Sequence, residues 1–212
     1  EAIRLLKIDP IIQMCSTSEV YGQVSSKEVP IKETVPIRPA SPYAVSKVTQ
    51  DLLARTYFVS YDMKVVITRM FSYLNPRRDD LFASAFAKQV AWIENGLQKK
   101  LLHGNLDSIR TIIDVRDAMR AYWLAAEKCE VGQIYNIGSN NPIKLNDYIA
   151  AIEKCLGKKA IKNYLPLQPG DVPATNADVS ELVNNFNYKP NTSINDGIEM
   201  FIKWYKDYYK TE

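Results

Sequence analysis

The sequence has 212 residues, of which 46% are hydrophobic and 24% are charged, a composition typical of a globular protein rather than a disordered chain. Its formal net charge is only +3, which excludes the strongly basic surface of a dedicated nucleic-acid-binding protein. No apolar run approaches the roughly 20 residues that a membrane helix needs. We therefore expect neither a nucleic-acid partner nor a membrane partner.

Predicted helices and strands alternate along most of the chain. In chain order they are a helical pattern over 1–9, a buried strand over 11–15, a polar stretch over 16–42, a helix over 43–61, a strand over 64–68, helices over 82–95 and 115–128, and a strand over 133–137. This alternation predicts an α/β protein with a parallel sheet, because parallel neighbours need helical crossovers. Beyond Gly138, helices over 145–156 and 196–209 flank a stretch rich in proline, which predicts a smaller second lobe.

The cysteines and the histidine limit the chemistry that the chain can perform. Cys15, Cys129 and Cys155 are odd in number and far apart, and no signal peptide is visible, so we expect no disulfide framework and a reducing, cytoplasmic location. His103 is the single histidine and has no partner at ligand spacing, so we expect neither a metal site nor a Ser-His-Asp triad. Acid-base chemistry must then use Tyr, Lys, Glu or Asp.

The segment 41–47 places a tyrosine and a lysine on one helical turn. Pro42 favours a helix start, so Tyr43 and Lys47, four residues apart, share one helix face. A nearby ammonium group stabilises phenolate and lowers a tyrosine pKa from about 10 toward a value useful to a base. Such a pair can remove a proton from a sugar hydroxyl while hydride leaves the same carbon. The alternative interpretation is an ordinary surface pair.

The segment 15–22 follows directly from the first predicted strand. Ligands of open α/β sheets bind beyond the carboxyl ends of strands. If the extended geometry continues, Thr17 and Glu19, two residues apart, point the same way into that crevice. The alternative interpretation is a polar loop without a catalytic role.

Together, Ser16-Thr17-Ser18-Glu19-Val20-Tyr21-Gly22 and Ser41-Pro42-Tyr43 through Lys47 resemble the extended short-chain dehydrogenase/reductase family that acts on nucleotide-diphosphate sugars. The carboxylate at Glu19 resembles the version found in sugar-nucleotide dehydratases and some decarboxylases, whereas simple 4-epimerases usually lack it. Leu102-His103-Gly104-Asn105-Leu106-Asp107-Ser108-Ile109-Arg110 is similar to GDP-mannose 4,6-dehydratases and their close reductase relatives. The tail Gln168-Pro169-Gly170-Asp171-Val172-Pro173 is more similar to the uronate-epimerase branch.

The resemblance implies roles for named residues. The implied catalytic residues are Thr17, Glu19, Tyr43 and Lys47; the implied cofactor contacts are Ser16, Tyr43, Lys47 and Arg69; the implied substrate contacts are Ser18, Ser72, Asn75, Arg110, Gln168 and Asp171. For Arg110 the role suits a guanidinium facing a pyrophosphate, and its alternative is a surface ion pair with Asp107 or Asp114. The implied cofactor is NADP, with NAD as the alternative, and the implied assembly is a homodimer or a higher homo-oligomer.

The sequence also departs from the family pattern. No Gly-x-Gly-x-x-Gly motif occurs among its eight glycines, so by resemblance about a hundred residues that carry the first strands and the glycine-rich turn lie outside this chain. Ser72 stands where relatives often have asparagine, and Thr111 where they usually have aspartate. The expected fold is the C-terminal part of a doubly wound, Rossmann-like parallel sheet with a smaller α/β substrate lobe, divided into 1–69 with 108–138 and 70–107 with 139–212.

The function implied by the resemblance is the conversion of GDP-mannose to its 4-dehydro-6-deoxy product through transient oxidation at carbon 4. A nucleotide-sugar 4-epimerase and a 4-keto-sugar-nucleotide reductase are the alternative enzymes. An alternative of another class is a non-catalytic fragment that binds sugar nucleotides.

Overall fold

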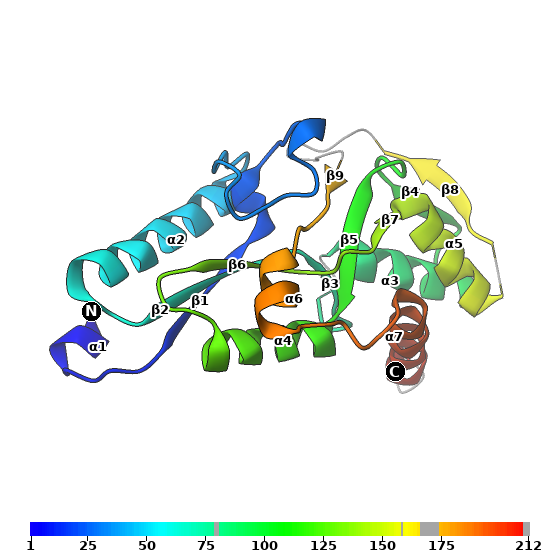
Figure 1. Ribbon diagram of the computed structural model, residues 1–212. Coiled ribbons are helices and arrows are strands. Elements are labelled where there is room, and N and C mark those ends of the chain that lie inside the picture. Colours follow the sequence, from blue (N-terminus) through cyan, green and yellow to red (C-terminus); the bar gives the residue numbers. More distant parts are fainter. Residues whose placement is uncertain (79–80, 158, 166–173, 210–212) are drawn as a thin grey trace.

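The computed structural model describes residues 1–78, 81–157, 159–165 and 174–209, and Figure 1 labels its elements. They are α1 (Ala2–Leu5), β1 (Ile12–Thr17), the 3₁₀ helices η1 (Ser18–Tyr21) and η2 (Ser26–Glu28), α2 (Pro42–Tyr61), β2 (Val65–Met70), β3 (Ser72–Leu74), α3 (Phe82–Glu94), β4 (Lys100–His103), β5 (Ile109–Asp114), α4 (Val115–Lys128), β6 (Ile134–Ile137), β7 (Pro142–Lys144), α5 (Leu145–Leu156), β8 (Ile161–Tyr164), β9 (Ala174–Thr175), α6 (Ser180–Phe186) and α7 (Ile194–Tyr209).

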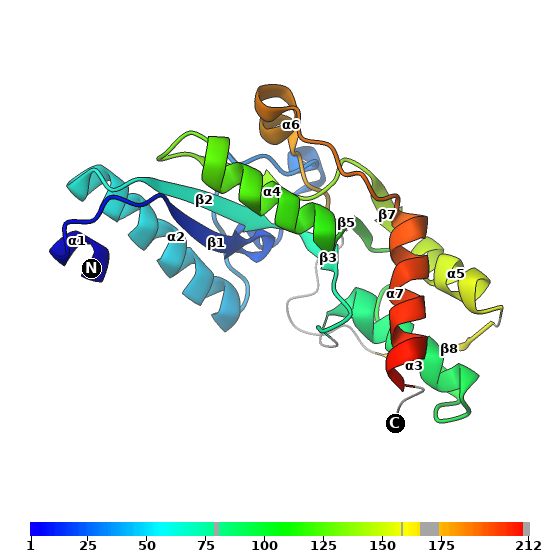
Figure 2. The ribbon, with the colours of Figure 1, turned by 90° about the horizontal axis from the view of Figure 1, so that it is seen from below.

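A three-stranded parallel sheet in the order β1–β2–β6 forms the first lobe. Every residue of β2, the middle strand, is buried, as expected for a parallel strand covered on both faces. Helix α2 covers one face of this sheet and α4 the other, as Figures 1 and 2 show from two sides. The predicted α/β fold with a parallel sheet is confirmed.

The element ends follow local chemistry. Helix α2 starts where expected, because Pro42 occupies its first turn and the Ser41 hydroxyl accepts the N–H of Ala44 at 3.1 Å. It ends at Asp62, which adopts a left-handed conformation with φ of 53°. The helical pattern over 1–9 yields only the short α1, none of whose residues is buried. Without a packed face, so short a segment has little to stabilise a longer helix.

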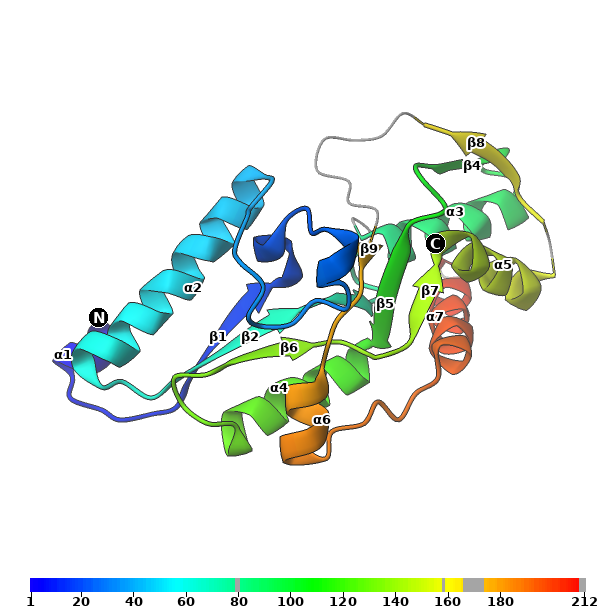
Figure 3. The same ribbon diagram turned by 45° about the horizontal axis from the view of Figure 1, so that its top comes forward.

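The second lobe surrounds an apolar core. Helices α3, α5 and α7 pack against one another beside β3 and β5 (Figure 3), and Tyr148, Ile149 and Ile152 are fully buried among them. Strands β4 and β8 form a separate parallel pair at the edge of this lobe. The residue boundaries predicted for the two lobes stay a prediction.

Candidate active site

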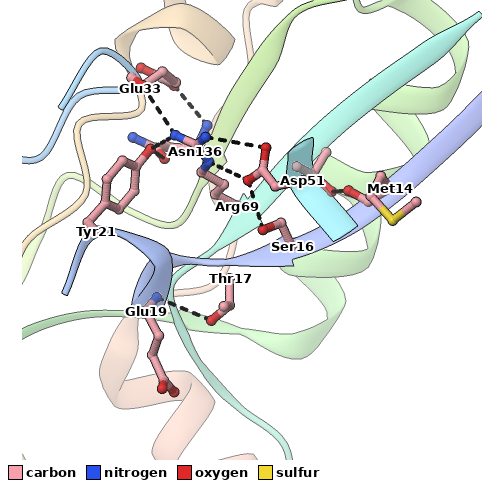
Figure 4. Close-up of polar contacts among 10 residues, drawn as sticks. Met14, Ser16, Thr17, Glu19, Tyr21, Glu33, Asp51, Arg69 and Asn136 are labelled. Carbon is pink, nitrogen blue, oxygen red and sulfur yellow. Dashed lines mark hydrogen bonds and ion pairs between the residues drawn. The ribbon is translucent and has the colours of Figure 1, made fainter. Parts of the chain in front are cut away.

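The end of β1 carries two of the predicted catalytic side chains. The strand stops at Thr17 and the chain turns into η1, in which the Thr17 Oγ1 accepts the backbone N–H of Glu19 at 3.4 Å. The expectation that extended geometry continues to Glu19 is therefore wrong, because this hydroxyl caps a 3₁₀ turn instead. Figure 4 nevertheless shows both side chains on the same side of β1.

Glu19 contacts the first turn of α2. Partial burial raises the pKa of the Glu19 carboxyl above its ordinary value, although a hydrogen bond with the Ser41 side chain acts in the opposite direction. Ser41 is the N-cap of α2, so this contact joins the turn after β1 to the start of the helix. A raised pKa favours the protonated form of a carboxyl group, which suits a residue that gives a proton as well as taking one.

Tyr43 and Lys47 lie on the same part of α2. The Tyr43 side chain is 50% exposed. The Lys47 Nζ donates to the carbonyl oxygen of Cys15 at 3.1 Å and to the side chain of Gln50 at 3.0 Å. The structure thus gathers the four predicted catalytic residues where the carboxyl end of β1 meets the first turns of α2.

The opposite side of β1 holds a buried ion pair that the sequence analysis did not identify. The guanidinium of Arg69 binds Asp51 through two of its nitrogens, Nε to Oδ2 at 2.9 Å and Nη2 to Oδ1 at 3.3 Å. Both side chains are 3% exposed. The Ser16 hydroxyl donates to the same Asp51 Oδ2 at 3.0 Å. The cofactor contacts expected for Ser16 and Arg69 are not favoured by this geometry, because both side chains face the interior (Figure 4).

A second group of polar side chains continues from Arg69. Its Nη1 donates to the Tyr21 hydroxyl at 3.0 Å, and that hydroxyl donates to the Asn136 Oδ1 at 2.7 Å. Burial raises the pKa of Tyr21 to about 12 even though the charge of Arg69 opposes this. The Asn136 Nδ2 reaches the carbonyl oxygens of Ile31 and Asp178 at 2.9 and 3.3 Å. We refer to Ser16, Asp51, Arg69, Tyr21 and Asn136 as the buried polar chain.

A signal for the buried polar chain was present in the sequence. Ala44, Asp51 and Ala54 are the buried residues of α2, and their spacings of seven and three residues define one inward helix face. A carboxylate on that face requires a buried partner. Arg69, which directly follows the strand predicted over 64–68 and lies within β2, is the partner that this spacing argument could have identified.

The predicted substrate contacts within the described residues lie just after β1, in and just after β3, and on β5. Ser18 starts η1, and Ser72 and Asn75 lie in and just after β3. The Asn75 Oδ1 accepts the N–H of Arg77 at 3.1 Å, and its carbonyl accepts the Ser84 hydroxyl at 2.8 Å. Asn75 therefore shapes the turn that leads toward α3. Gln168 and Asp171 lie outside the described residues.

Arg110 lines a cavity of about 290 Å³ between α3, β4 and β5. Phe82, Phe86 and His103 contribute to the same lining. The Arg110 Nη1 donates to the carbonyl of Ile109 at 2.9 Å. This position combines a cation with aromatic walls.

Two acidic or polar neighbours of Arg110 have other partners. Asp114, which the sequence analysis considered as an ion-pair partner of Arg110, binds the Arg116 side chain at 2.7 Å. Thr111 is 1% exposed, and its hydroxyl accepts the N–H of Ala177 at 3.1 Å and donates to the carbonyl of Thr175 at 3.3 Å. Thr111 therefore joins β5 to the segment around β9.

The described residues contain neither a metal-binding cluster nor a membrane-spanning helix. No group of three or more His, Cys, Asp and Glu side chains within the described ranges is arranged to hold a metal ion. None of the helices that the structure describes is long and apolar enough to cross a membrane.

The chain matches known proteins over almost its whole length. The family model described as GDP-mannose 4,6 dehydratase matches residues 1–201. Protein CapI of Staphylococcus aureus is 33% identical over 92% of this chain, and UDP-glucuronate 4-epimerase 2 of Arabidopsis thaliana is 30% identical over 95%. The chain spans 63% of the length of CapI and 49% of that of the Arabidopsis protein.

Solved structures agree with this match. UDP-glucuronic acid 4-epimerase of Bacillus cereus, in complex with UDP-glucuronic acid and NAD, superposes with a TM-score of 0.87 at 31% identity, covering 98% of this chain and 65% of that chain. RMD of Pseudomonas aeruginosa, complexed with NADPH, superposes with a TM-score of 0.91 at 23% identity, covering 98% of this chain and 70% of that one; this likeness shows the fold. With the motifs of β1 and α2, these matches establish that the chain belongs to the GDP-mannose 4,6-dehydratase family, within the extended short-chain dehydrogenases/reductases that act on nucleotide sugars.

Proposed function

We propose that this chain carries the catalytic and sugar-nucleotide-binding part of an NAD(P)-dependent nucleotide-sugar 4,6-dehydratase that acts on GDP-mannose. The observation that carries the proposal is Glu19, which follows β1 on the same side as Thr17 and whose partly buried carboxyl contacts Ser41, the N-cap of α2, and has a raised pKa. Such a carboxyl is required only if a proton leaves carbon 5 of the sugar, which a simple 4-epimerisation does not need.

The residues present fit one end of a nicotinamide cofactor. Tyr43 is half exposed and Lys47 lies at the carboxyl end of β1, where ligands of open α/β sheets bind. Structures of relatives are complexed with NADPH or NAD. The glycine-rich turn that would hold the pyrophosphate is not among the residues of this chain. We infer a nicotinamide cofactor, with NADP favoured by the resemblance and NAD as the alternative.

In the proposed reaction, each residue of the site has its own role. A bound nicotinamide would accept the hydride from carbon 4 and return it to carbon 6, so the cofactor would undergo no net redox change. Tyr43, with the Lys47 ammonium near it and the Thr17 hydroxyl as a hydrogen-bond partner, removes the proton from the hydroxyl at carbon 4. The resulting ketone acidifies the hydrogen at carbon 5. Glu19 removes that proton and protonates the hydroxyl at carbon 6, which leaves as water and gives an unsaturated ketone. Hydride at carbon 6 and a proton from solvent at carbon 5, delivered through Glu19, then complete the 4-keto-6-deoxy product.

Arg110 is proposed to bind the diphosphate of the substrate. Its guanidinium lies in the lining of the 290 Å³ cavity beside Phe82 and Phe86. A planar cation matches phosphate oxygens, and aromatic walls match a nucleotide base. Replacing Arg110 by Met should raise the KM for the sugar nucleotide more than it lowers kcat, because the contact is made in both ground and transition states.

The comparisons favour a second candidate, a UDP-glucuronate 4-epimerase. Proteins of that name from Arabidopsis and from Thermodesulfobacterium geofontis are 30% and 32% identical to this chain. A reductase is a further alternative, since a GDP-6-deoxy-D-mannose reductase of Pseudomonas aeruginosa is 34% identical over 63% of the chain. A reductase consumes NADPH stoichiometrically, whereas a dehydratase and an epimerase do not. A protein that binds sugar nucleotides without turnover would show binding alone.

Product analysis in heavy water separates these candidates. The complete reading frame that contains this chain is expressed and incubated with GDP-mannose and, separately, with UDP-glucuronate. A dehydratase should incorporate deuterium at carbon 5 of a 4-keto-6-deoxy product, because carbon 5 takes its final proton from solvent. A 4-epimer without deuterium at carbon 5 would assign the epimerase instead.

The variant Glu19→Gln tests the role of the carboxyl. Oxidation at carbon 4 should still occur, since Tyr43 and Lys47 remain, but elimination of water should slow by about a hundredfold or more. Glu127→Gln is the matched control, because Glu127 is an exposed carboxylate on α4. Unchanged turnover in Glu19→Gln would contradict the dehydratase proposal.

We also propose self-association through the outer face of α2. Val45, Leu52, Leu53, Val59 and Tyr61 are each at least half exposed on this helix, and apolar faces of this kind mark interaction surfaces. Light scattering of the purified protein should give at least twice the monomer mass. Leu53→Glu should shift the protein to monomer, and a wild type that stays monomeric at micromolar concentration would contradict the proposal.

A further inference from the structure

Ser16 and Thr17 are adjacent on β1 but face opposite sides of it. Thr17 lies on the side of Glu19, and Ser16 lies on the side of Asp51 (Figure 4). This follows from the alternation of side chains along a strand. The Ser16 hydroxyl is thus separated from the proposed chemistry, although it is only one residue away from it in the sequence.

The hydroxyl of Ser16 has a charged and immobile partner. It donates to Asp51 Oδ2 at 3.0 Å, and Ser16 is 5% exposed. Asp51 is itself held by two nitrogens of Arg69, whose Nη1 contacts the Tyr21 hydroxyl and the carbonyl of Glu33 at 3.0 and 3.2 Å. A hydrogen bond to a charged acceptor is stronger than one between neutral groups, and this one joins two short side chains, so it restrains the distance between β1 and α2.

Asp51 lies on the same stripe of α2 as the proposed base. Tyr43, Lys47 and Asp51 follow one another at intervals of four residues, which places them along one helix face. Asp51 is about 12 Å further along the helix axis than Tyr43. A helix is stiff, so a small change of angle at Asp51 displaces Tyr43 relative to Thr17.

A second contact, made by Lys47, also joins this face of α2 to β1 but allows a wider range of distances between them. The Lys47 Nζ donates to the carbonyl of Cys15 at 3.1 Å, so adjacent residues of β1 bind successive turns of α2. The lysine side chain has four rotatable carbons and tolerates a range of distances. Ser16 and Asp51, with short side chains, supply the contact that sets the spacing.

We propose that Ser16 is a positioning residue, which holds α2 at a set distance from β1 through Asp51 and thereby places Tyr43 against Thr17. The proposal rests on the proposed function for its kinetic consequences. It departs from the cofactor contact that the family resemblance implied for Ser16, because it gives that hydroxyl a protein partner in the interior.

The test compares variants that differ by one hydroxyl, made in the complete reading frame that contains this chain. Ser16→Ala and Ser16→Val remove the hydroxyl, whereas Ser16→Thr keeps it in a side chain of the same shape as Val. Ala and Val should lower kcat about tenfold to a hundredfold, the scale of a misplaced reacting group, with the KM values for sugar nucleotide and cofactor within twofold. Thr should recover most of the activity relative to Val.

Thr68→Val is the matched control. The Thr68 hydroxyl is also buried and also reaches β1, donating to the carbonyl of Met14 at 3.3 Å. It also accepts the Gln13 side chain at 3.5 Å, so both of these contacts are with β1 rather than α2. This variant should lose comparable stability and keep kcat within twofold. Equal losses of kcat in Thr68→Val and Ser16→Ala would overturn the proposal, and so would a raised KM for cofactor with unchanged kcat in Ser16→Ala.

Amide hydrogen exchange gives a readout that does not depend on the reaction. The N–H groups of Glu19 and of the first turns of α2 should exchange faster in Ser16→Ala and Ser16→Val than in Ser16→Thr or Thr68→Val. If no nucleotide sugar is turned over, the proposed function fails, but this difference in exchange still supports a positioning role for Ser16. Identical exchange in all four variants would overturn the positioning role of Ser16, whether or not the variants are active.

Discussion

The two lobes of this protein have cores of different chemistry. Beneath the ends of β1 and β2, the interior holds the charged pair of Arg69 and Asp51 and the hydroxyls of Ser16 and Tyr21. The second lobe instead packs Ile149, Ile152 and other apolar side chains around Tyr148. Apolar cores accept many substitutions of similar volume, whereas a buried polar group must meet each partner in one geometry. The difference indicates that precise placement is concentrated next to the proposed chemistry.

The largest expected effect comes from breaking the ion pair. Asp51→Ala leaves the buried Arg69 guanidinium without its counter-charge, and we expect a loss of about 3–5 kcal/mol in the free energy of unfolding. Urea denaturation measures this loss. The double variant Asp51→Leu with Arg69→Met should recover part of it, because it removes both charges together. A single variant as stable as the wild type would mean that the pair does not organise this core.

An acidic anchor at the start of α4 provides an intermediate effect that depends on pH. Asp117 accepts the N–H groups of Asn191 and Thr192 at 3.1 and 2.9 Å and also binds Arg120. Burial alone would raise the pKa of Asp117, but these contacts outweigh burial and lower it below the ordinary value. The carboxylate therefore contributes stability above the unfolded-state pKa of about 3.9, and that contribution is lost as the pH falls through the lower folded-state pKa.

The variant Asp117→Asn isolates this contribution. It should be less stable than the wild type at pH 7 by about 1–3 kcal/mol, because hydrogen bonds to a charged acceptor are replaced by weaker ones. The difference between the two proteins should shrink as the pH is lowered below about 4. Thermal unfolding measured at several pH values checks this, and a difference that grows toward low pH would contradict the assignment.

The smallest effect is expected in the apolar core. Ile152→Val removes one buried methylene group from the second lobe, and we expect a loss of about 0.5–1.5 kcal/mol. The kcat of the complete protein should stay within twofold of the wild-type value, because no polar contact is altered. A large loss of kcat here would show that the two cores are not functionally different.

The sequence predicted the long helices and the three strands of the first sheet, but it predicted neither the strands of the second lobe nor α6, and it did not predict the polar interior. Helix α4 has the predicted bounds, since its apolar period and the following Gly132 are local signals. The strand end at Thr17 and the turn of η1 were not predicted, because a hydroxyl that caps a 3₁₀ turn competes with continued extension. The gathering of Thr17, Glu19, Tyr43 and Lys47 was anticipated from motifs.

The contacts of the buried polar chain join residues far apart in the sequence. Tyr21 and Asn136 are 115 positions apart, and Ser16 and Asp51 are 35 apart. Local patterns report which face of an element is buried but not which distant side chain meets it. Only the inward position of Asp51 on α2 could have indicated that a cation lay opposite.

The alternation of side chains along β1 has a consequence for which positions can be substituted. Ser16 and Thr17 face opposite sides of β1, and Glu19 lies on the side of Thr17. Residues 17 and 19 can therefore differ between reactions while Ser16 keeps the spacing between β1 and α2. An insertion or deletion of one residue in β1 would turn the side chains to the opposite faces of the strand, so the contact of Ser16 with Asp51 and the position of Thr17 would be lost together. New activities should therefore arise here by point substitution, and designers who alter the chemistry should leave the length of this strand unchanged.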